Sequence, residues 1–281
     1  MSSALKIKAL NALSWNVAGK IGFMAVNLVI GIIIARILTP ADYGLIGMIA
    51  IFIALSEVFM RSGFAEAYVK KKEVSHLDAN TILFSNLFIS LFFYGLLWVF
   101  APVISKFYDQ PILIPLTRVS GLILIIQAFT IIQATQLRRN LNFKRKTKIG
   151  FIGIIVSGIA GVIAAYYGLG VWSLVIKNLL NKIISTILLW LTSKWRPTFQ
   201  FSKESFKGMF SFGIWVLGTN LLKKFFDNLY KLVIGKFFSA AQLGFYTKAK
   251  ELQTIASNQI MISISSVSFP VFSSMQDNKK Q

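Results

Sequence analysis

The 281-residue sequence contains no cysteine, a single histidine and only ten acidic residues. The absence of cysteine excludes disulfides, thiolate metal ligands and cysteine nucleophiles. The histidine, His76, lies in a basic loop where we expect it to be solvated. Phosphate-binding G-x-x-x-x-G-K-[ST] motifs are missing, since Gly19-Lys20 and Gly235-Lys236 are followed by Ile21 and Phe237, which argues against ATP-driven pumping. We therefore predict no catalytic residues, no metal site, no cofactor and no enzymatic activity.

Hydrophobic residues dominate the composition. They make up 55% of the chain, charged residues only 14%, and the mean hydropathy is +0.66. A soluble domain of this composition would expose too much apolar surface, so the sequence predicts a polytopic membrane protein. The net charge of +20 does not indicate nucleic-acid binding, because the cations separate apolar spans and do not gather on one soluble domain.

Eight segments approach the roughly 20 apolar residues that a spanning helix needs. They are Ser14–Leu38, Tyr43–Met60, Thr81–Ile104, Ile112–Gln133, Ile149–Tyr167, Val171–Ser193, Met209–Phe238 and Leu252–Phe272. Lysine and arginine cluster before the first span and after the second, fourth and sixth, while the alternate loops hold few cations. The positive-inside rule then predicts that both ends of the chain lie in the cytoplasm.

An internal repeat with an offset of 200 residues aligns the first span with the seventh. Trp15 aligns with Trp215, Ile34 with Ile234 and Gly44 with Gly244. Chance resemblance between apolar helices explains part of this alignment but not the paired basic residue and glycine after the helix end. Parallel repeats of this kind are found in many secondary transporters. We predict an all-α bundle in which residues 1–195 form a six-helix lobe, 196–208 a cytoplasmic linker, and 209–281 the first two helices of a second lobe.

Charged side chains interrupt the span Met209–Phe238. A charge at the bilayer centre costs about 2.5–3.5 kcal/mol, so such residues seldom face lipid. At about 100° per residue the polar side chains share one arc of about 140°. The arc comprises Asn220, Lys223, Lys224, Asp227, Asn228 and Lys231. We predict that Lys223, Lys224 and Lys231 contact an anionic substrate, and that Asp227 pairs with Lys223 or Lys231 at i±4 spacing.

Two other spans carry lysine beside amides on one face. In the sixth span Lys177, Asn181 and Lys182 share an arc with Ser185 and Asn178, and in the first span Asn16, Lys20 and Asn27 lie within about 40°. Snorkelling of the long side chains to the interface is the alternative interpretation. We expect Lys20, Lys177, Lys182, Asn16 and Asn181 to form the wall of a cationic cavity opposite Asn220 and its neighbours. Glu57, four residues before Arg61, is interpreted as half of a structural ion pair.

Four sequence runs resemble signatures of a known family. They are Ala35-Arg36-Ile37-Leu38-Thr39-Pro40-Ala41-Asp42-Tyr43-Gly44, Gln136-Leu137-Arg138-Arg139-Asn140-Leu141-Asn142-Phe143-Lys144-Arg145, Gly168-Leu169-Gly170-Val171-Trp172-Ser173-Leu174 and Gly244-Phe245-Tyr246-Thr247-Lys248-Ala249. Together they are similar to the bacterial polysaccharide (O-antigen type) flippases of the multidrug/oligosaccharidyl-lipid/polysaccharide exporter superfamily. The resemblance implies two six-helix lobes that alternate between inward- and outward-open states. Since most of the second lobe is missing, we expect the chain to be truncated.

The resemblance also implies a function. A flippase of this family moves a lipid-linked anionic oligosaccharide, carried on undecaprenyl diphosphate, across the bacterial cytoplasmic (inner) membrane. Its expected partners are that substrate, bilayer lipids and the polysaccharide polymerisation machinery. Three alternatives stay open: a cation-coupled multidrug antiporter, which should carry lone acids in its first lobe; a membrane glycosyltransferase or polymerase, which should have a large extramembrane loop; and an inactive fragment.

Overall fold

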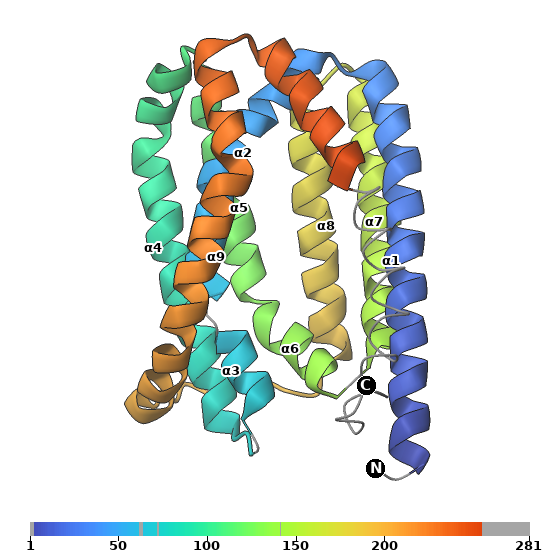
Figure 1. Cartoon of the computed structure of the whole chain (residues 1–281), viewed down its shortest axis with the longest axis vertical. Helices are drawn as coiled ribbons and strands as arrows, with labels where there is room; N and C mark the ends of the chain where they lie inside the picture. Colours follow the sequence, from blue (N-terminus) through green and yellow to red (C-terminus); the bar gives the residue numbers. More distant parts are fainter. Residues whose placement is uncertain (1–2, 62–63, 72, 141, 255–281) are drawn as a thin grey trace, which may run out of the picture.

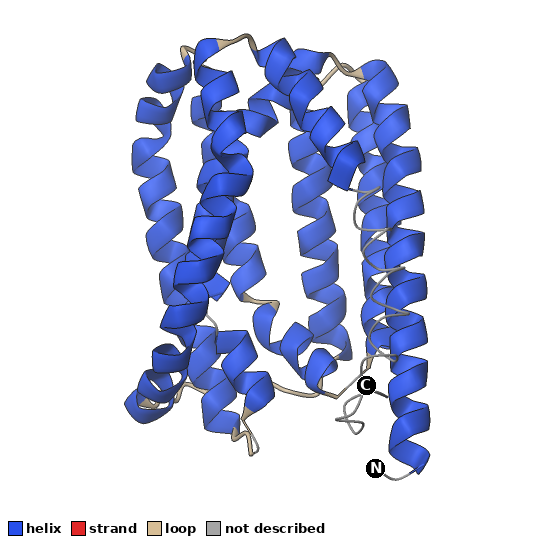
Figure 2. Ribbon diagram, viewed as in Figure 1, coloured by secondary structure: helices blue, strands red, loops and turns tan. Residues whose placement is uncertain are grey.

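The computed structural model describes residues 3–61, 64–71, 73–140 and 142–254, and these residues form helices and connecting turns without any strand (Figure 2). The long helices run along one common direction and form an elongated bundle (Figure 1). The helices are α1 (Ser3–Ile37), α2 (Pro40–Arg61), α3 (Phe64–Lys70), α4 (His76–Tyr108), α5 (Leu113–Ala128), α6 (Ile131–Arg139), α7 (Phe143–Tyr166), α8 (Val171–Thr192) and α9 (Lys203–Phe237). A further helix covers residues 240–254.

The predicted all-α membrane bundle is confirmed. Helices α2, α4, α7 and α8 are each long and apolar enough to cross a membrane, and the bent pair α5–α6 gives a fifth candidate. The apolar part of α1, Ile21–Ile37, is shorter. The span predicted at Leu252–Phe272 lies almost wholly outside the described residues, so the total of eight spans stays a prediction.

The predicted span Ile112–Gln133 is not one straight helix. It is divided into α5 and α6, which meet at an angle of 46°. At the bend, the Thr130 hydroxyl and backbone N–H both donate to Gln127 O, at 2.6 and 3.0 Å. Trp190 Nε1 of α8 donates to Phe129 O at 2.9 Å. The Gln127 and Phe129 carbonyls at the break are therefore paired, as a bent helix requires where water is scarce.

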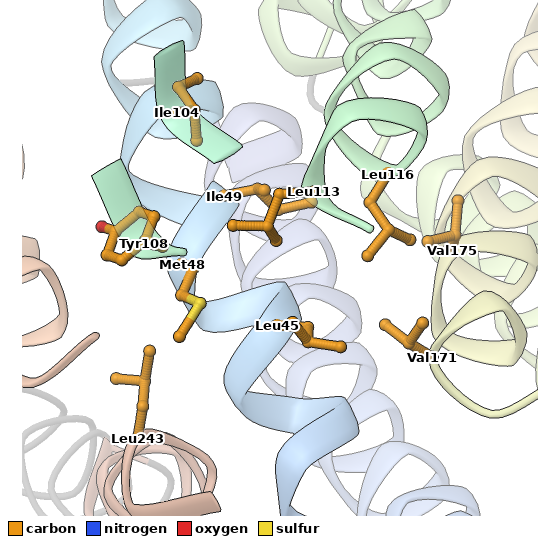
Figure 3. Close-up of a cluster of buried hydrophobic side chains, with 10 residues drawn as sticks. All are labelled: Leu45, Met48, Ile49, Ile104, Tyr108, Leu113, Leu116, Val171, Val175 and Leu243. Atoms are coloured by element: carbon orange, nitrogen blue, oxygen red, sulfur yellow. The ribbon is translucent and has the colours of Figure 1, made fainter. Parts of the chain in front are cut away.

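The two ends of the bundle differ. One end, here called the turn end, holds the short connections after α1, α4 and α7; the opposite end, the elbow end, holds α3, α6 and the N-terminus (Figure 1). Near the turn end a buried apolar cluster joins α2, α4, α5 and α8 to the helix 240–254 (Figure 3). Its members are Leu45, Met48, Ile49, Ile104, Tyr108, Leu113, Leu116, Val171, Val175 and Leu243.

The predicted linker 196–208 is partly helical and docked. Helix α9 begins at Lys203, with Ser202 as its N-cap. The preceding residues bind the start of α4, because Asn80 Nδ2 donates to Thr198 Oγ1 at 2.6 Å and Ser202 N donates to Thr81 Oγ1 at 3.1 Å. His76 is exposed, as expected, and its Nε2 also lies 3.0 Å from Arg196 O. The exposed imidazole is thus also anchored to the residues that follow α8.

The 200-residue repeat is visible in the helix ends. Helices α1 and α9 are both 35 residues long and begin and end at equivalent positions. After each, a reciprocal cap starts the next helix. Thr39 N donates to Asp42 Oδ2 at 2.9 Å and Asp42 N to Thr39 Oγ1 at 3.4 Å, while Ser239 N donates to Gln242 Oε1 at 3.0 Å and Gln242 N to Ser239 Oγ at 3.2 Å. Both are capping boxes, which fix where a helix begins.

The same caps place two helices in a reciprocal contact. A Cβ added to Gly44 would lie 1.8 Å from Ala240 O, and one added to Gly244 would lie 1.8 Å from Pro40 O. Residue 240 is the repeat equivalent of residue 40, so the two contacts are equivalent under the repeat. The helix that starts at residue 240 begins twelve residues before the predicted span Leu252–Phe272, which itself lies almost wholly outside the described residues.

Candidate functional site

The polar arc of α9 lies on a helix whose middle is open to its surroundings. Lys223, Lys224, Asp227 and Asn220 are exposed, whereas Lys231 is half-buried and Asn228 is buried. Lys231 Nζ donates to Asn228 Oδ1 at 3.1 Å, and Asn228 Nδ2 donates to Lys224 O at 2.9 Å. The buried amide thus holds Lys231 against its own helix.

The expected pairing of Asp227 takes the form of an electrostatic influence on Lys231 and not of a close ion pair. Within the described part of the chain, no ion pair joins Asp227 to Lys223 or Lys231. An exposed pair at i±4 spacing contributes only about 0.2–0.5 kcal/mol, which is too little to fix two mobile side chains. The Lys231 ammonium instead donates to Asn228 Oδ1, an acceptor on a buried side chain.

Helix α8 places its polar residues against two neighbours. Lys182 Nζ donates to Gln127 Oε1 of α5 at 3.1 Å, and Asn181 Nδ2 donates to Ser157 Oγ of α7 at 3.4 Å. Lys177 is half-buried, and its stem packs on α7, where a Cβ added to Gly161 would lie 2.9 Å from Lys177 Cβ. Lys182 and Asn181 therefore crosslink the bundle. Among the described residues, no hydrogen bond engages the ammonium group of Lys177.

Asn16 and Lys20, the predicted residues of the first span, lie on α1, but their side chains are outside the described part of the structure. Backbone packing places this helix against α7. Helix α9 packs against α2, α4 and α3, while α8 packs against α7, α5 and α2. Helix α2 is thus the neighbour that α8 and α9 share.

The helix 240–254 supplies the link between the α8 and α9 lysines that sequence reasoning missed. Its Glu251 carboxylate acts electrostatically on both Lys177 of α8 and Lys231 of α9, and Lys231 is also influenced by Lys224 and Asp227 of its own helix. Lys248, one turn earlier, is ion-paired with Glu251 at 2.9 Å, and its Nζ lies 4.2 Å from the ring centroid of Tyr43 on α2. We call Lys177, Lys231, Lys248 and Glu251 the lysine seam. It carries three cations and one anion, so its net charge is positive.

A second polar feature lies between α2, α5 and α8. A cavity of about 200 Å³ there is lined mainly by apolar side chains, with Glu57, Ser120 and Asn178 as its polar members. The expected Glu57–Arg61 pair lies outside the described residues, since the side chain of Arg61 is not among them. Within the described residues, no hydrogen bond or ion pair engages the Glu57 carboxylate. An acid in such a cavity is a candidate for binding a cation or a proton.

Comparison with known proteins gives a consistent set of matches. A family model described as "Polysaccharide biosynthesis protein" matches residues 33–281. The teichuronic acid biosynthesis protein TuaB of Bacillus subtilis is 27% identical over 77% of this chain and 45% of its own length. The succinoglycan biosynthesis transport protein ExoT of Rhizobium meliloti and the lipopolysaccharide biosynthesis protein WzxC of Escherichia coli are each 22% identical. They are matched over 95% and 99% of this chain and 54% and 57% of their own lengths. No solved structure matches.

The chain spans about half the length of the curated relatives it matches. The names of these relatives concern polysaccharide biosynthesis, and that of ExoT includes transport.

Proposed function

Because the chain belongs to the polysaccharide biosynthesis protein family, we propose that it moves a lipid-linked anionic oligosaccharide across the bacterial cytoplasmic membrane. The substrate class is a polysaccharide repeat unit on undecaprenyl diphosphate, and the mechanism is alternating access of two lobes. In this proposal the elbow end faces the cytoplasm, as the distribution of cations favours. Residues 1–195 form the first lobe, 196–208 the connection, and 209–281 the beginning of the second lobe.

The observation that carries the proposal is the lysine seam. Lys177 and Lys231 come from different helices, are half-buried, and share the electrostatic influence of one carboxylate, Glu251. Withdrawing cations from water is costly unless an anion compensates them. Even with Asp227, which also acts on Lys231, two carboxylates face the three lysines of the seam, so its net charge is positive and a diphosphate or an acidic sugar supplies the further anion. Lys223 and Lys224, exposed on the same helix as Lys231, extend the positive field toward the elbow end.

The remaining predicted residues take supporting roles in this scheme. Lys182 and Asn181 hold α8 against α5 and α7, and so position Lys177. Asp227 moderates the positive charge of α9, and Asn220 offers a hydrogen-bonding amide beside Lys223 and Lys224. Bilayer lipids surround the bundle, and the polymerisation machinery receives the translocated unit.

Charge-neutralising variants of the complete protein test the proposal. Lys177→Gln and Lys231→Gln, separately and together, should lower the rate of lipid-linked oligosaccharide flipping in proteoliposomes by about 10- to 100-fold, as expected for losing a charge-assisted hydrogen bond. Lys231→Arg should retain most activity because it keeps the charge. Lys148→Gln is the matched control, since Lys148 is an exposed cation on α7 outside the seam. Wild-type flipping by the double variant at equal protein levels would refute the assignment.

A second candidate, cation-coupled antiport, is favoured by one observation, the Glu57 carboxylate in the cavity between α2, α5 and α8. An antiporter needs an acid that binds a cation or proton in one state and releases it in the other. Glu57→Gln should then abolish the dependence of transport on an imposed ion gradient. If the variant transports with unchanged gradient dependence, Glu57 has no coupling role.

A further inference from the structure

A separate polar cavity lies at the elbow end, away from the lysine seam. Its volume is about 530 Å³, within the range of ligand pockets. It is enclosed by α6, the beginning of α7, the end of α8 and the residues that follow α8. Three of its lining residues are cationic, Arg139, Arg145 and Lys194, and within the described part of the chain no acidic residue lines it.

The two arginines are held in fixed orientations by backbone carbonyls. Arg139 Nη1 donates to Tyr68 O at 2.7 Å and to Lys71 O at 2.6 Å. Arg145 Nη2 donates to Thr192 O in the last turn of α8. Guanidinium groups that are oriented in advance lose less entropy on binding an oxyanion, and their planar geometry suits phosphate oxygens.

The cavity wall contains a buried amide whose polar atoms need hydrogen-bond partners. Gln133 of α6 lines the cavity, is only 2% exposed, and finds no hydrogen-bond partner for its Oε1 or its Nε2 among the described residues. The indole Nε1 of Trp195, which also lines the cavity, likewise has no partner among the described residues. A buried polar group without a partner costs about 1–3 kcal/mol, so native proteins seldom retain one without a reason. Both Gln133 Nε2 and Trp195 Nε1 are donors, and they share the cavity with three cations.

The geometry points to a phosphate-binding site in this cavity, distinct from the proposed transport path. Donors and cations converge there without any carboxylate, which favours an oxyanion. The cavity also lies at the helix ends, where a lipid head group is within reach. Basic pockets between membrane helices bind the head groups of anionic lipids in this way. The same chemistry suits free phosphate, and the two sources are separated by experiment.

The test is a binding measurement on the purified full-length protein in neutral detergent, and it requires no transport activity. The probes are phosphatidylglycerol, phosphatidylcholine and inorganic phosphate, read out by native mass spectrometry and thermal unfolding. Phosphatidylglycerol, but not phosphatidylcholine, should bind and raise the melting temperature. Stabilisation by inorganic phosphate as well would identify free phosphate as a sufficient ligand, and its absence would identify a lipid-borne phosphate; either result supports the site.

The variants separate a binding role from a structural one. Arg145→Gln and Gln133→Leu should each weaken phosphatidylglycerol binding at least about tenfold. Gln133→Leu should also melt at an equal or higher temperature than wild type without ligand, because it removes an unsatisfied amide. This variant keeps the test decisive even if Arg145→Gln fails to fold. Lys148→Gln, which removes an exposed cation one turn along α7 from Arg145, should bind as wild type does. Equal binding by wild type and Gln133→Leu, or no response of wild type to either phosphate probe, overturns the proposal.

Discussion

Alanine at Gly44 or Gly244 should force apart the helices that begin at residues 40 and 240. A Cβ at either position would lie 1.8 Å from a backbone carbonyl oxygen, whereas real Cβ atoms essentially never come closer than 3.0 Å. The shortfall is about 1.2 Å. Because the opposing atom belongs to the backbone, no side-chain rotation can relieve the clash, and one helix must move as a whole.

The cost of that movement follows from two opposing terms. Overpacking a close contact costs about 1–3 kcal/mol, and a clash against backbone belongs at the upper end. Alanine regains about 1 kcal/mol through its higher helix propensity. Each single substitution should therefore destabilise the protein by about 2 kcal/mol. Because one separation of the helices relieves both clashes, the double variant should also cost about 2 kcal/mol and not twice that value.

Thermal and chemical unfolding in detergent measure these differences. The matched controls are Gly31→Ala and Gly95→Ala, helical glycines with nothing within 4 Å of an added Cβ, which should be neutral or stabilising. The absence of native cysteine allows a direct probe of the helix separation. Thr247 Oγ1 lies 2.9 Å from a Cβ placed at Gly47, so the pair Gly47→Cys and Thr247→Cys should form a disulfide readily. Adding Gly44→Ala should slow its formation.

Two results would refute this reasoning. If Gly44→Ala and Gly244→Ala were as stable as the control variants, the helices would not cross this closely. If the double variant cost the sum of the singles, the two clashes would be independent, contrary to the reciprocal geometry.

Two further predictions concern the caps and the elbow end. Thr39→Ala and Ser239→Ala should each lower the free energy of unfolding by about 1 kcal/mol, because each removes an equivalent N-cap; unequal losses in chemical denaturation would argue against structurally equivalent repeats. Asp78→Asn should cost about 1–3 kcal/mol, since the Asp78 carboxylate is buried and accepts from Lys71 Nζ at 2.8 Å and from Ser75 N at 2.9 Å. Because Lys71 joins α3 to α4 through this pair, limited proteolysis at the elbow end should accelerate in Asp78→Asn but not in Lys203→Gln, and equal rates would contradict the pairing.

Hydropathy and breaker residues located the long apolar helices well. Proline and glycine at Thr39-Pro40 and Gly168-Leu169-Gly170 mark turns that the structure contains, and Gly170 has a φ of +52° that suits glycine. The bend between α5 and α6 was not predictable in this way. No proline lies between residues 116 and 140, and the partner that satisfies Phe129 O is Trp190, 61 residues away.

The lysine seam was only partly predictable. Helical periodicity groups Lys231 with its neighbours on α9 and Lys177 with its neighbours on α8, but it cannot say which faces meet. The missing element was the helix 240–254, whose Lys248, Lys250 and Glu251 lower the local hydropathy, so that a hydropathy window places the span start at Leu252. The repeat contained the better signal, because α2 begins at Pro40 and its equivalent is residue 240.

The two copies of the repeat share residues that build the fold but differ at several positions that carry lysine in the second copy. The capping boxes and the glycines of the crossing occur in both copies. Three of the lysines do not: Lys223 stands where the first copy has Phe23, Lys231 where it has Gly31, and Lys248 where it has Met48. Phe23 stacks on Phe151 of α7 at 4.6 Å, and Met48 is in the buried cluster, so these positions in the first copy serve packing. The same backbone frame therefore carries packing residues in one copy and cations in the other. The charges of the lysine seam are then not required by the frame, which is the reason for seeking their role in what the protein binds.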